Sequence, residues 1–465
     1  MSHPLSTCES TKSTFSLVAW ADDAWTSLIQ QIFHYGWTPL ARLARTAVLS
    51  LMQRIARGSL RVITPKDVHQ FPTVKSADDP RESRDEPKAE LRVIKDVFWL
   101  RLFAMADLGF AEAYMFGEVE CDDLVSLFKI FILNRQNMSE LDSSASYLLR
   151  IPQKLTSWRF LSTLSNSRAN VAAHYDISNE SSHSEGFLSK DMTYSCAIFE
   201  DLDADLAIER PEQRQIGGQL SPPSNETQSS TLSSDDPSAR DELYDAQIRK
   251  LNHIIAKAQI SSGQKILEIG SGWGSMAILI AQRFPDTTID TLTLSVQQQR
   301  LAQARIKKAG VEDRVTVYLM DYRAMPSSWK SSFDRVISVE MIENVGIEFL
   351  TEYWRVVDWA MKTHTSVGVV QVITIPEALF PGGALPSLTI LLRSMEAGSS
   401  GRLVVDSVSN IGPHYARTLR EWRRRFLDKF ETVVVPALKA EHPTVMNGPH
   451  GAAEIEVFKR KWLYY

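Results

Sequence analysis

The sequence predicts an α/β fold with a mostly parallel sheet, preceded by a smaller α+β domain. Between residues 246 and 375, short apolar runs that suit buried strands alternate with segments of helical periodicity, as in a sheet with crossover helices. A glycine-rich segment, Gly270 to Gly274, joins one of these strands directly to a helix. The 465 residues, of which 44% are hydrophobic, suffice for two or three domains.

The chain divides by composition into three parts. Residues 1–36 are polar and predicted to be disordered or poorly defined, residues 37–165 form the N-terminal domain, and residues 166–465 form the α/β domain. The N-terminal domain begins with a basic amphipathic helix over 37–57, which either packs within the domain or lies on an anionic membrane surface. A strand over 58–63 and an apolar region over 97–133 follow, and charged residues over 68–90 predict a loop. Within the α/β domain, the Ser- and Pro-rich segment 202–240 predicts a disordered insertion.

Regular elements follow that insertion. Helical spacing of apolar residues predicts the helices, and short apolar or β-branched runs predict the strands. The expected helices span 246–258, 274–283, 296–308 and 349–361, and the expected strands span 265–269, 288–294, 315–319, 333–339 and 368–375.

Charge and cysteine content exclude several classes of protein. The formal net charge of −5 provides no overall basic field for nucleic acid. Cys8, Cys121 and Cys196 are too few and too scattered for a disulfide framework or a metal cluster. The polar start argues against a signal peptide, and the longest apolar runs fall short of the ~20 residues that span a bilayer. We therefore expect a cytoplasmic protein that meets any lipid from the membrane surface.

The glycine-rich segment predicts a cofactor site. It has the pattern E-x-G-x-G-x-G at the end of a strand, where glycines allow close approach and the following helix offers N–H groups to an anion such as a carboxylate. The alternative is an ordinary turn. Polar residues that follow the next two strands could also contact the cofactor; for Asp321 and Tyr322 the alternative is a surface turn. The candidates are Glu268, Gly270, Gly272, Trp273, Gly274, Thr293, Gln298, Asp321 and Tyr322.

Read together, the motifs resemble the cyclopropane-fatty-acyl-phospholipid synthase family, which includes the mycolic acid cyclopropane synthases. The resemblance rests on a series of motifs in a fixed order. It covers roughly residues 37–465 without the insertion. The motifs are His174 to Glu180 (HYDISNE), Met192 to Ala197 (MTYSCA), Gly270 to Gly274, Thr293 to Ser295 (TLS), Asp321 to Arg323 (DYR), Ser338 to Gly346 (SVEMIENVG), Phe380 to Gly383 (FPGG) and Asn410 to Tyr415 (NIGPHY).

The resemblance implies a class I, Rossmann-like methyltransferase domain that binds S-adenosyl-L-methionine. Its substrate would be an unsaturated phospholipid at the membrane surface, and a cis double bond of the acyl chain would receive a methylene or methyl group. A bound bicarbonate would deprotonate the carbocation. A homodimer is one further expectation. By resemblance, Tyr194 and Ser195 touch the cofactor, and the catalytic residues are Cys196, through its backbone N–H, with Glu343, Gln371, Ile373 and Tyr415.

The sequence also departs from the family pattern. The link between Glu180 and Phe187 is polar, only three residues separate Pro376 from Phe380, and relatives continue past Tyr465. These differences predict that parts of the lid and the last strands of the sheet are absent. Two alternatives therefore stay open: a cofactor-binding homologue impaired in catalysis, and a C-methyltransferase that acts on another lipid or a small molecule.

Overall fold

The structure is a computed structural model that describes residues 38–72, 86–138, 187–208, 241–374 and 385–464. The chain forms two compact units: Met1–Trp158 with Leu438–Tyr465, and Arg159–Ala437. The N-terminal segment 1–36, the motif at 174–180, the motif at 380–383 and most of the insertion lie outside the described residues.

The first unit is built on a four-stranded sheet with the order β2-β1-β3-β4. Strand β1 pairs antiparallel with β2 and parallel with β3, and β3 pairs antiparallel with β4. Apolar side chains from β1, β3, α2, α3 and α4 form one buried cluster. The elements are α2 (Thr38–Met52), β1 (Ser59–Ile63), β2 (Val68–Phe71), β3 (Lys88–Val93), α3 (Val97–Met115), β4 (Val119–Cys121), α4 (Leu124–Leu133), α5 (Arg135–Met138), α17 (Pro443–Met446) and α18 (Gly451–Tyr464).

The expected loop over 68–90 is wrong at both of its ends. Strand β2 occupies its start and strand β3 its end. The charged side chains of β3 face outward while Ala89, Leu91 and Val93 are buried, so a period-two pattern is present within a polar composition. The residues between 73 and 85 lie outside the described part of the chain.

The apolar face of α2 is buried. Ala44, Val48 and Met52 belong to the core of the first unit, so the structure favours the domain-helix interpretation of this segment over a membrane-surface helix.

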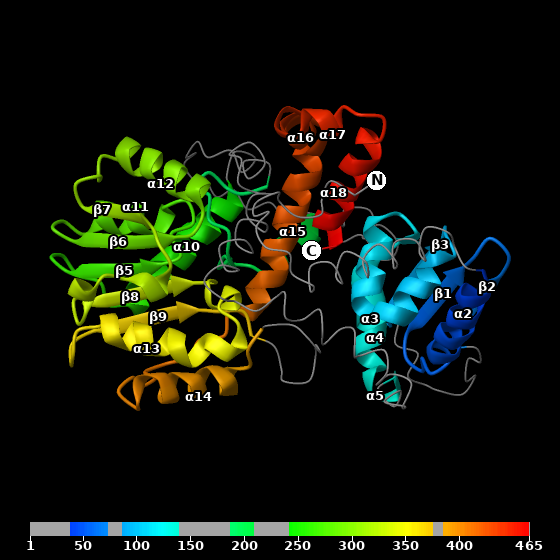
Figure 1. Ribbon diagram of the computed structural model, residues 1–465, viewed down its shortest axis with the longest axis horizontal. Coiled ribbons are helices and arrows are strands. Elements are labelled where there is room, and N and C mark those ends of the chain that lie inside the picture. Colours follow the sequence, from blue (N-terminus) through cyan, green and yellow to red (C-terminus); the bar gives the residue numbers. More distant parts are fainter. Residues whose placement is uncertain (1–37, 73–85, 139–186, 209–240, 375–384, 465) are drawn as a thin grey trace, which may run out of the picture. The chain divides into compact units, whose positions relative to one another are not determined.

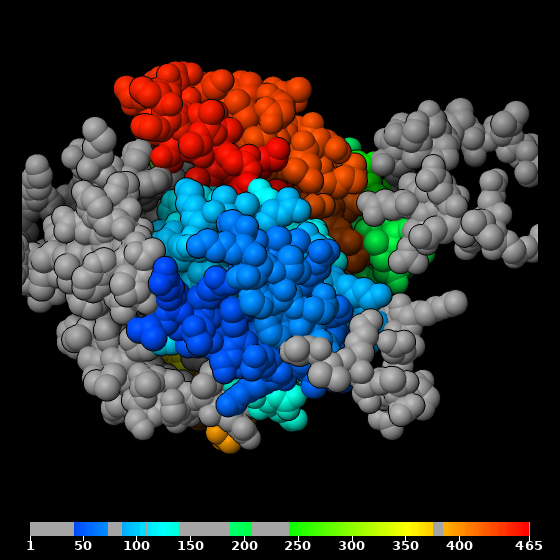
Figure 2. All heavy atoms as spheres, turned by 90° about the vertical axis from the view of Figure 1, so that its right-hand side faces the viewer, coloured from blue at the N-terminus to red at the C-terminus, as the bar shows by residue number. Residues whose placement is uncertain are grey.

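The last helix, α18, belongs to the first unit. The sequence had predicted that residues 166–465 form one α/β domain. The Tyr464 ring of α18 lies 5.9–6.3 Å from the rings of Phe110, Tyr114 and Phe128. Figure 2 shows the C-terminal helices in red beside the cyan and blue segments of this unit.

The second unit is built on a parallel sheet of five strands with the order β7-β6-β5-β8-β9. Helices α10, α11 and α12 cover one face and α13 and α14 the other (Figure 1), because successive strand residues such as Ile266 and Leu267 point to opposite sides and enter separate buried clusters. The sheet and its principal helices are α10 (Glu242–Lys257), β5 (Lys265–Ile269), α11 (Ser275–Arg283), β6 (Thr288–Thr293), α12 (Val296–Lys308), β7 (Val315–Leu319), β8 (Arg335–Val339), α13 (Leu350–Ala360), β9 (Val367–Gln371), α14 (Leu388–Ser399) and α15 (Gly412–Lys429).

Shorter elements complete the second unit. The predicted α/β class is confirmed, and β5, α12 and β7 have the predicted bounds. The strand predicted over 368–375 ends at Gln371. The shorter elements are α9 (Ala204–Ile208), η4 (Tyr322–Ala324), η5 (Ser327–Trp329), η6 (Ile342–Asn344), η7 (Ile347–Phe349), η8 (Phe430–Val434) and α16 (Val435–Glu441), which crosses the boundary between the units.

The start of the expected disordered insertion is helical instead. Helix α9 lies within 202–240, and its Asp205 forms ion pairs with Arg417 and Arg420 of α15. Two guanidinium groups of α15 thus hold this short helix through Asp205, a long-range contact that composition alone cannot reveal.

Candidate active site

A pocket lies at the carboxyl ends of strands β5 to β8, the edge of a parallel sheet where ligands usually bind. The loop after β5 forms its floor. The N–H groups of Gly270 and Ser271 both donate to the carbonyl of Leu292 at the end of β6, at 3.0 and 2.8 Å. These two hydrogen bonds fix the loop between neighbouring strands, so the cradle is preformed.

The loop needs glycine at two of its positions. Gly270 has φ +99° and Gly272 has φ +46°, a region that other residues rarely adopt. A Cβ at Gly272 would meet no atom within 4 Å, so the backbone there borders open space. A ligand can therefore approach the main chain closely at this point.

Two opposite charges are buried in the pocket wall. Glu268 is 4% exposed, and burial raises the pKa of its carboxyl group to about 7, although Thr291 Oγ1 donates to it at 2.6 Å. Lys250 of α10 is fully buried, which lowers its pKa to about 8, and its Nζ donates to Ser195 Oγ at 2.6 Å. Lys250 thus places a buried basic group in the pocket wall, close to Ser195.

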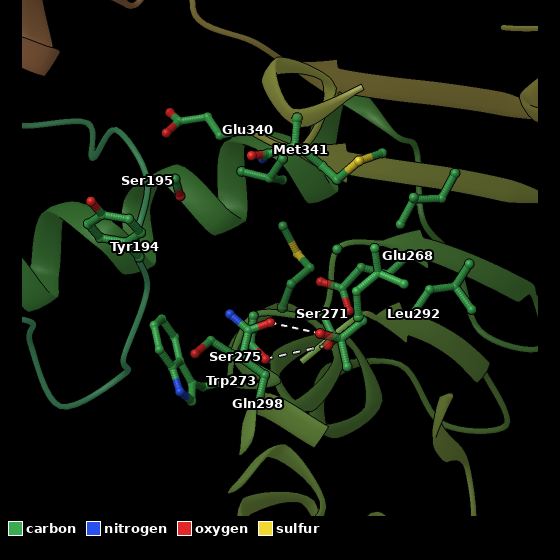
Figure 3. A pocket seen from close by; sticks show the side chains of 18 of the residues that line it. Tyr194, Ser195, Glu268, Ser271, Trp273, Ser275, Leu292, Gln298, Glu340 and Met341 are labelled. Carbon is green, nitrogen blue, oxygen red and sulfur yellow. Dashed lines mark hydrogen bonds between the residues drawn. The ribbon is translucent and has the colours of Figure 1, made fainter. Parts of the chain in front are cut away.

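Two side-chain pairs shape the rest of the wall. Thr293 Oγ1 donates to Gln298 Oε1 at 2.7 Å, which orients the amide group of Gln298. Asp321 holds the guanidinium of Arg323 through two 2.8 Å hydrogen bonds. The Asp321 carboxylate is thus committed to Arg323. In Figure 3, Glu268 and Gln298 lie across the pocket from Tyr194 and Ser195.

In the wall of this pocket, Glu340 connects three segments of the chain. It follows β8 directly and has φ +48°, a strained value for a residue with a side chain. Its Oε1 accepts hydrogen bonds from the Cys196 N–H and from Gln371 Nε2, both at 2.8 Å. Its own N–H donates to the carbonyl of Gln371 at 2.8 Å. Glu340 therefore joins the ends of β8 and β9 to the segment that carries Cys196.

Glu343 forms a second carboxylate site nearby. Its Oε1 accepts from the Ile373 N–H at 2.5 Å, whereas its Oε2 is buried without a hydrogen-bond partner. Burial raises the pKa of Glu343 to about 7, and the negative charge of Glu340 adds to that increase.

An aromatic cluster adjoins Tyr194. Its ring stacks on Trp422 with centroids 4.9 Å apart, and the edges of Phe187 and Tyr415 approach Trp422 at 6.1 and 6.4 Å. Tyr415 and Trp422 lie on α15. The π faces of aromatic rings attract positive charge.

The structure gathers the predicted cofactor residues but separates the predicted catalytic ones. All the predicted cofactor-binding residues except Gly274, which caps α11, line the pocket. The predicted catalytic residues lie outside its lining and are linked in three places. Cys196 and Gln371 bind Glu340, Ile373 binds Glu343, and Tyr415 packs on Trp422.

Comparison with known proteins places the chain in a family. A family described as mycolic acid cyclopropane synthetase matches residues 227–444. Tuberculostearic acid methyltransferase UfaA1 of Mycobacterium tuberculosis is 31% identical over 417 residues, covering 84% of this chain and 85% of that protein. The chain belongs to the mycolic acid cyclopropane synthetase family. Its members include the cyclopropane-fatty-acyl-phospholipid synthase of Escherichia coli, 28% identical over 73% of this chain and 77% of that enzyme.

The family assignment confirms the resemblance seen in the motifs, and the chain is an enzyme of the S-adenosylmethionine-dependent methyltransferase and cyclopropane synthase kind. A solved structure of coclaurine N-methyltransferase bound to N-methylheliamine and SAH covers 77% of this chain and 93% of that one, with a TM-score of 0.52 and 17% identity. This likeness shows the fold alone.

Sequence reasoning missed Lys250 and Glu340 among the pocket residues of this family member. Lys250 interrupts the buried face of α10 formed by Leu243, Ala246 and Ile254, and a lysine in such a stripe is a readable signal. Glu340 directly follows a strand of the parallel sheet, a position at which polar residues commonly serve a ligand.

The described residues do not fit a bound bicarbonate. By resemblance, the anion was expected to contact the Cys196 N–H, Glu343 and Tyr415, with Gln371 and Ile373 on the neighbouring strand. In the structure Cys196 and Gln371 already donate to Glu340, and the Ile373 N–H donates to Glu343. A second anion would meet two carboxylates where it needs donors.

Proposed function

We propose that this chain transfers a one-carbon group from S-adenosyl-L-methionine to a cis double bond of an unsaturated phospholipid acyl chain. The observation that carries the proposal is the pocket at the carboxyl ends of β5 to β8, with its glycine cradle and its buried Glu268. The names of the relatives, a tuberculostearic acid methyltransferase and a cyclopropane-fatty-acyl-phospholipid synthase, support a lipid acceptor.

The polar atoms of the pocket fit this cofactor. Thr193 Oγ1, Trp273 Nε1 and Tyr322 OH are buried pocket atoms without a hydrogen-bond partner in the chain. Buried polar atoms are normally paired, so a polar ligand is expected to satisfy them. The glycine loop suits the carboxylate of the amino acid part, and the Glu268 carboxylate suits the ribose hydroxyl groups.

The chemistry divides between cofactor and chain. When bound, S-adenosylmethionine supplies an electrophilic methyl group. The chain holds the amino acid end through Tyr194 and Ser195, and the aromatic cluster of Phe187, Tyr194, Tyr415 and Trp422 can stabilise a carbocation on the acyl chain.

Labelled cofactor and lipid vesicles test this function. Vesicles of unsaturated phospholipid incubated with the protein and methyl-labelled S-adenosylmethionine should gain labelled acyl chains, and saturated vesicles should not. Unlabelled lipid despite cofactor binding by calorimetry would contradict the lipid assignment. Mass spectrometry of the fatty acids then separates a cyclopropane ring from a methyl branch.

We further propose that α4 contacts the phospholipid surface. Val125, Phe128 and Ile132 lie on one face of this helix and are 62%, 37% and 49% exposed, with Lys129 exposed among them. An apolar face with a basic residue suits an anionic bilayer. Among the described residues, the helices are too short or too polar to cross a membrane.

Replacing Val125, Phe128 and Ile132 by serine should weaken binding to anionic phospholipid vesicles at least about tenfold, because their exposed apolar area no longer enters the lipid. Vesicle co-sedimentation measures this. The matched control replaces Val404, Val405 and Val408, also exposed but on a segment without regular structure, by serine. Equal loss in both variants would show that α4 has no special role.

Changing Glu343 to glutamine should lower turnover about 10²-fold and leave cofactor affinity unchanged, because a buried carboxylate that can bind and release a proton, outside the pocket, is lost.

The same change should also remove a pH dependence from the stability of the fold. A pKa raised from 4.5 to about 7 contributes stability below pH 4.5 that is lost as the pH rises through 7. The variant should lose this slope, measured by thermal unfolding at several pH values.

The control for Glu343 is Glu348→Gln, an exposed carboxylate on the neighbouring η7. It should keep both the turnover and the pH slope of the parent protein. Wild-type turnover in Glu343→Gln would refute a catalytic role of Glu343.

A further inference from the structure

The carboxylate of Glu340 is held at the wall of the pocket by hydrogen bonds from two other segments of the chain. It lines the cofactor pocket, and its Oε1 is held by the Cys196 N–H and the Gln371 amide, both at 2.8 Å. Two donors from separate segments fix the carboxylate and favour its charged form. Figure 3 shows the Glu340 side chain on the same side of the pocket as Ser195.

The backbone supports the same conclusion. Glu340 keeps a left-handed φ of +48°, which costs a non-glycine residue about 1–3 kcal/mol and persists where the surroundings require it. Nothing about a turn after a strand demands a glutamate there, because glycine would adopt this φ without strain. The backbone conformation therefore does not explain a glutamate at position 340, and a function of its carboxylate does.

The charges around Glu340 suit a base. Lys250 on α10 is the nearby cation, and Glu343 on η6 and the Cys196 thiol are the other titratable groups that face it. Burial raises the pKa of Glu340, while its hydrogen bonds and Lys250 act in the opposite direction. A carboxylate with a raised pKa binds a proton more strongly than a solvent-exposed one, as a general base must.

From this geometry we propose that Glu340 is the general base of ring closure and takes the place of an exogenous anion such as bicarbonate. The inference rests on the proposed function and adds a catalytic residue to it. It assigns Cys196 and Gln371 the role of positioning residues, which act through the Glu340 carboxylate.

The step balances without a further reactant. The π electrons of the alkene form a bond to the cofactor methyl carbon, the carbon–sulfur bond breaks, and its electron pair stays on sulfur. The acyl chain then carries a carbocation next to the carbon with the new methyl group. Glu340 takes a proton from that methyl group, the C–H electron pair closes the three-membered ring, and the carboxylic acid later releases its proton to solvent.

Two substitutions at one position test the proposal. Glu340→Gln keeps the shape and a hydrogen-bonding oxygen but removes the charge, so ring closure should fall about 10²-fold or more while cofactor affinity in calorimetry stays unchanged. Glu340→Gly suits the local φ and is expected to fold. It leaves the Cys196 and Gln371 donors unpaired, so added bicarbonate or formate should restore part of its ring closure.

The wild type should be insensitive to bicarbonate. Its rate in carbonate-free buffer should match the rate with bicarbonate added, and labelled bicarbonate should show no line broadening by carbon NMR in its presence, whereas Glu340→Gly should broaden the signal. The control, Glu348→Gln, alters an exposed carboxylate outside the pocket and should behave as the wild type.

The outcomes separate the inference from the proposed function. Saturable stimulation of the wild type by bicarbonate, or undiminished ring closure in Glu340→Gln, would overturn the role of Glu340. A wild type that binds the cofactor but modifies no lipid would sink the proposed function. The NMR titration would even then decide whether Glu340 fills the anion position, since bicarbonate bound to the wild type would overturn that too.

Discussion

Replacing Gly270 by valine should weaken the binding of S-adenosylmethionine about 10- to 100-fold. Gly270 has φ +99°, and a Cβ there would lie 3.3 Å from the Cβ of Met341. A β-branched side chain cannot adopt this conformation without strain of about 1–3 kcal/mol, and relief requires the loop to move away from the ligand. A change of 1.4 kcal/mol is tenfold in affinity. Isothermal titration calorimetry measures the effect.

The control for Gly270 is Gly263→Val. Gly263 also has a positive φ, of +80°, but a Cβ there meets no atom within 4 Å, and the residue does not line the pocket. Both variants should lose stability in thermal unfolding. Only Gly270→Val should lose affinity, and equal affinity losses would mean that strain acts through the fold and not through the loop.

The periodic part of the fold could be predicted from the sequence. Helix α12 has the predicted bounds because apolar residues recur there at helical spacing, and strand β5 because it is a short apolar run bounded by turn residues. Strand β3 was missed because Lys88 and Glu90 dominate its composition, although its buried residues alternate. Composition and periodicity disagreed there, and pairing with β1 favoured the strand.

The candidate site was predictable where one short segment carries the information. The glycine loop and Glu268 are neighbours in the sequence and in the pocket. The position of Glu340 after a strand could have marked it as a pocket residue, but its hydrogen bonds could not be predicted, because Cys196 and Gln371 are 144 and 31 residues away in the chain. The order of the motifs identifies the family. Whether the Cys196 N–H and the Gln371 amide are available to a ligand depends on their hydrogen bonds, which only the structure shows.

Among the substitutions proposed for this protein, removing the buried guanidinium of Arg417 should cause the largest loss of stability. Arg417 is 1% exposed on α15, the helix that also carries Tyr415. It pairs with Asp205 of α9, with Glu242 of α10 at 2.7 Å and with Glu421 at 3.2 Å. Losing one partner of a buried pair leaves uncompensated charge and costs about 3–5 kcal/mol. Arg417→Met, which keeps an apolar stem, should therefore unfold at markedly lower denaturant concentration.

Arg424 is the matched control for Arg417. The two arginines lie about one helical turn from Glu421, on opposite sides of it, and both pair with its carboxylate. Arg424 also pairs with Glu421, at 2.8 Å, but is 54% exposed, and an exposed pair contributes about 0–1 kcal/mol. Arg424→Met should thus change stability little, so the two variants differ in burial and not in the charge removed. Because Arg417 ties α15 to α9 and α10, its loss should also loosen Tyr415 and lower turnover at temperatures where the protein is still folded. Equal stability of the two variants would contradict a stabilising role of the buried ion pairs of Arg417. It would also remove the argument that these ion pairs hold Tyr415 and the aromatic cluster in place.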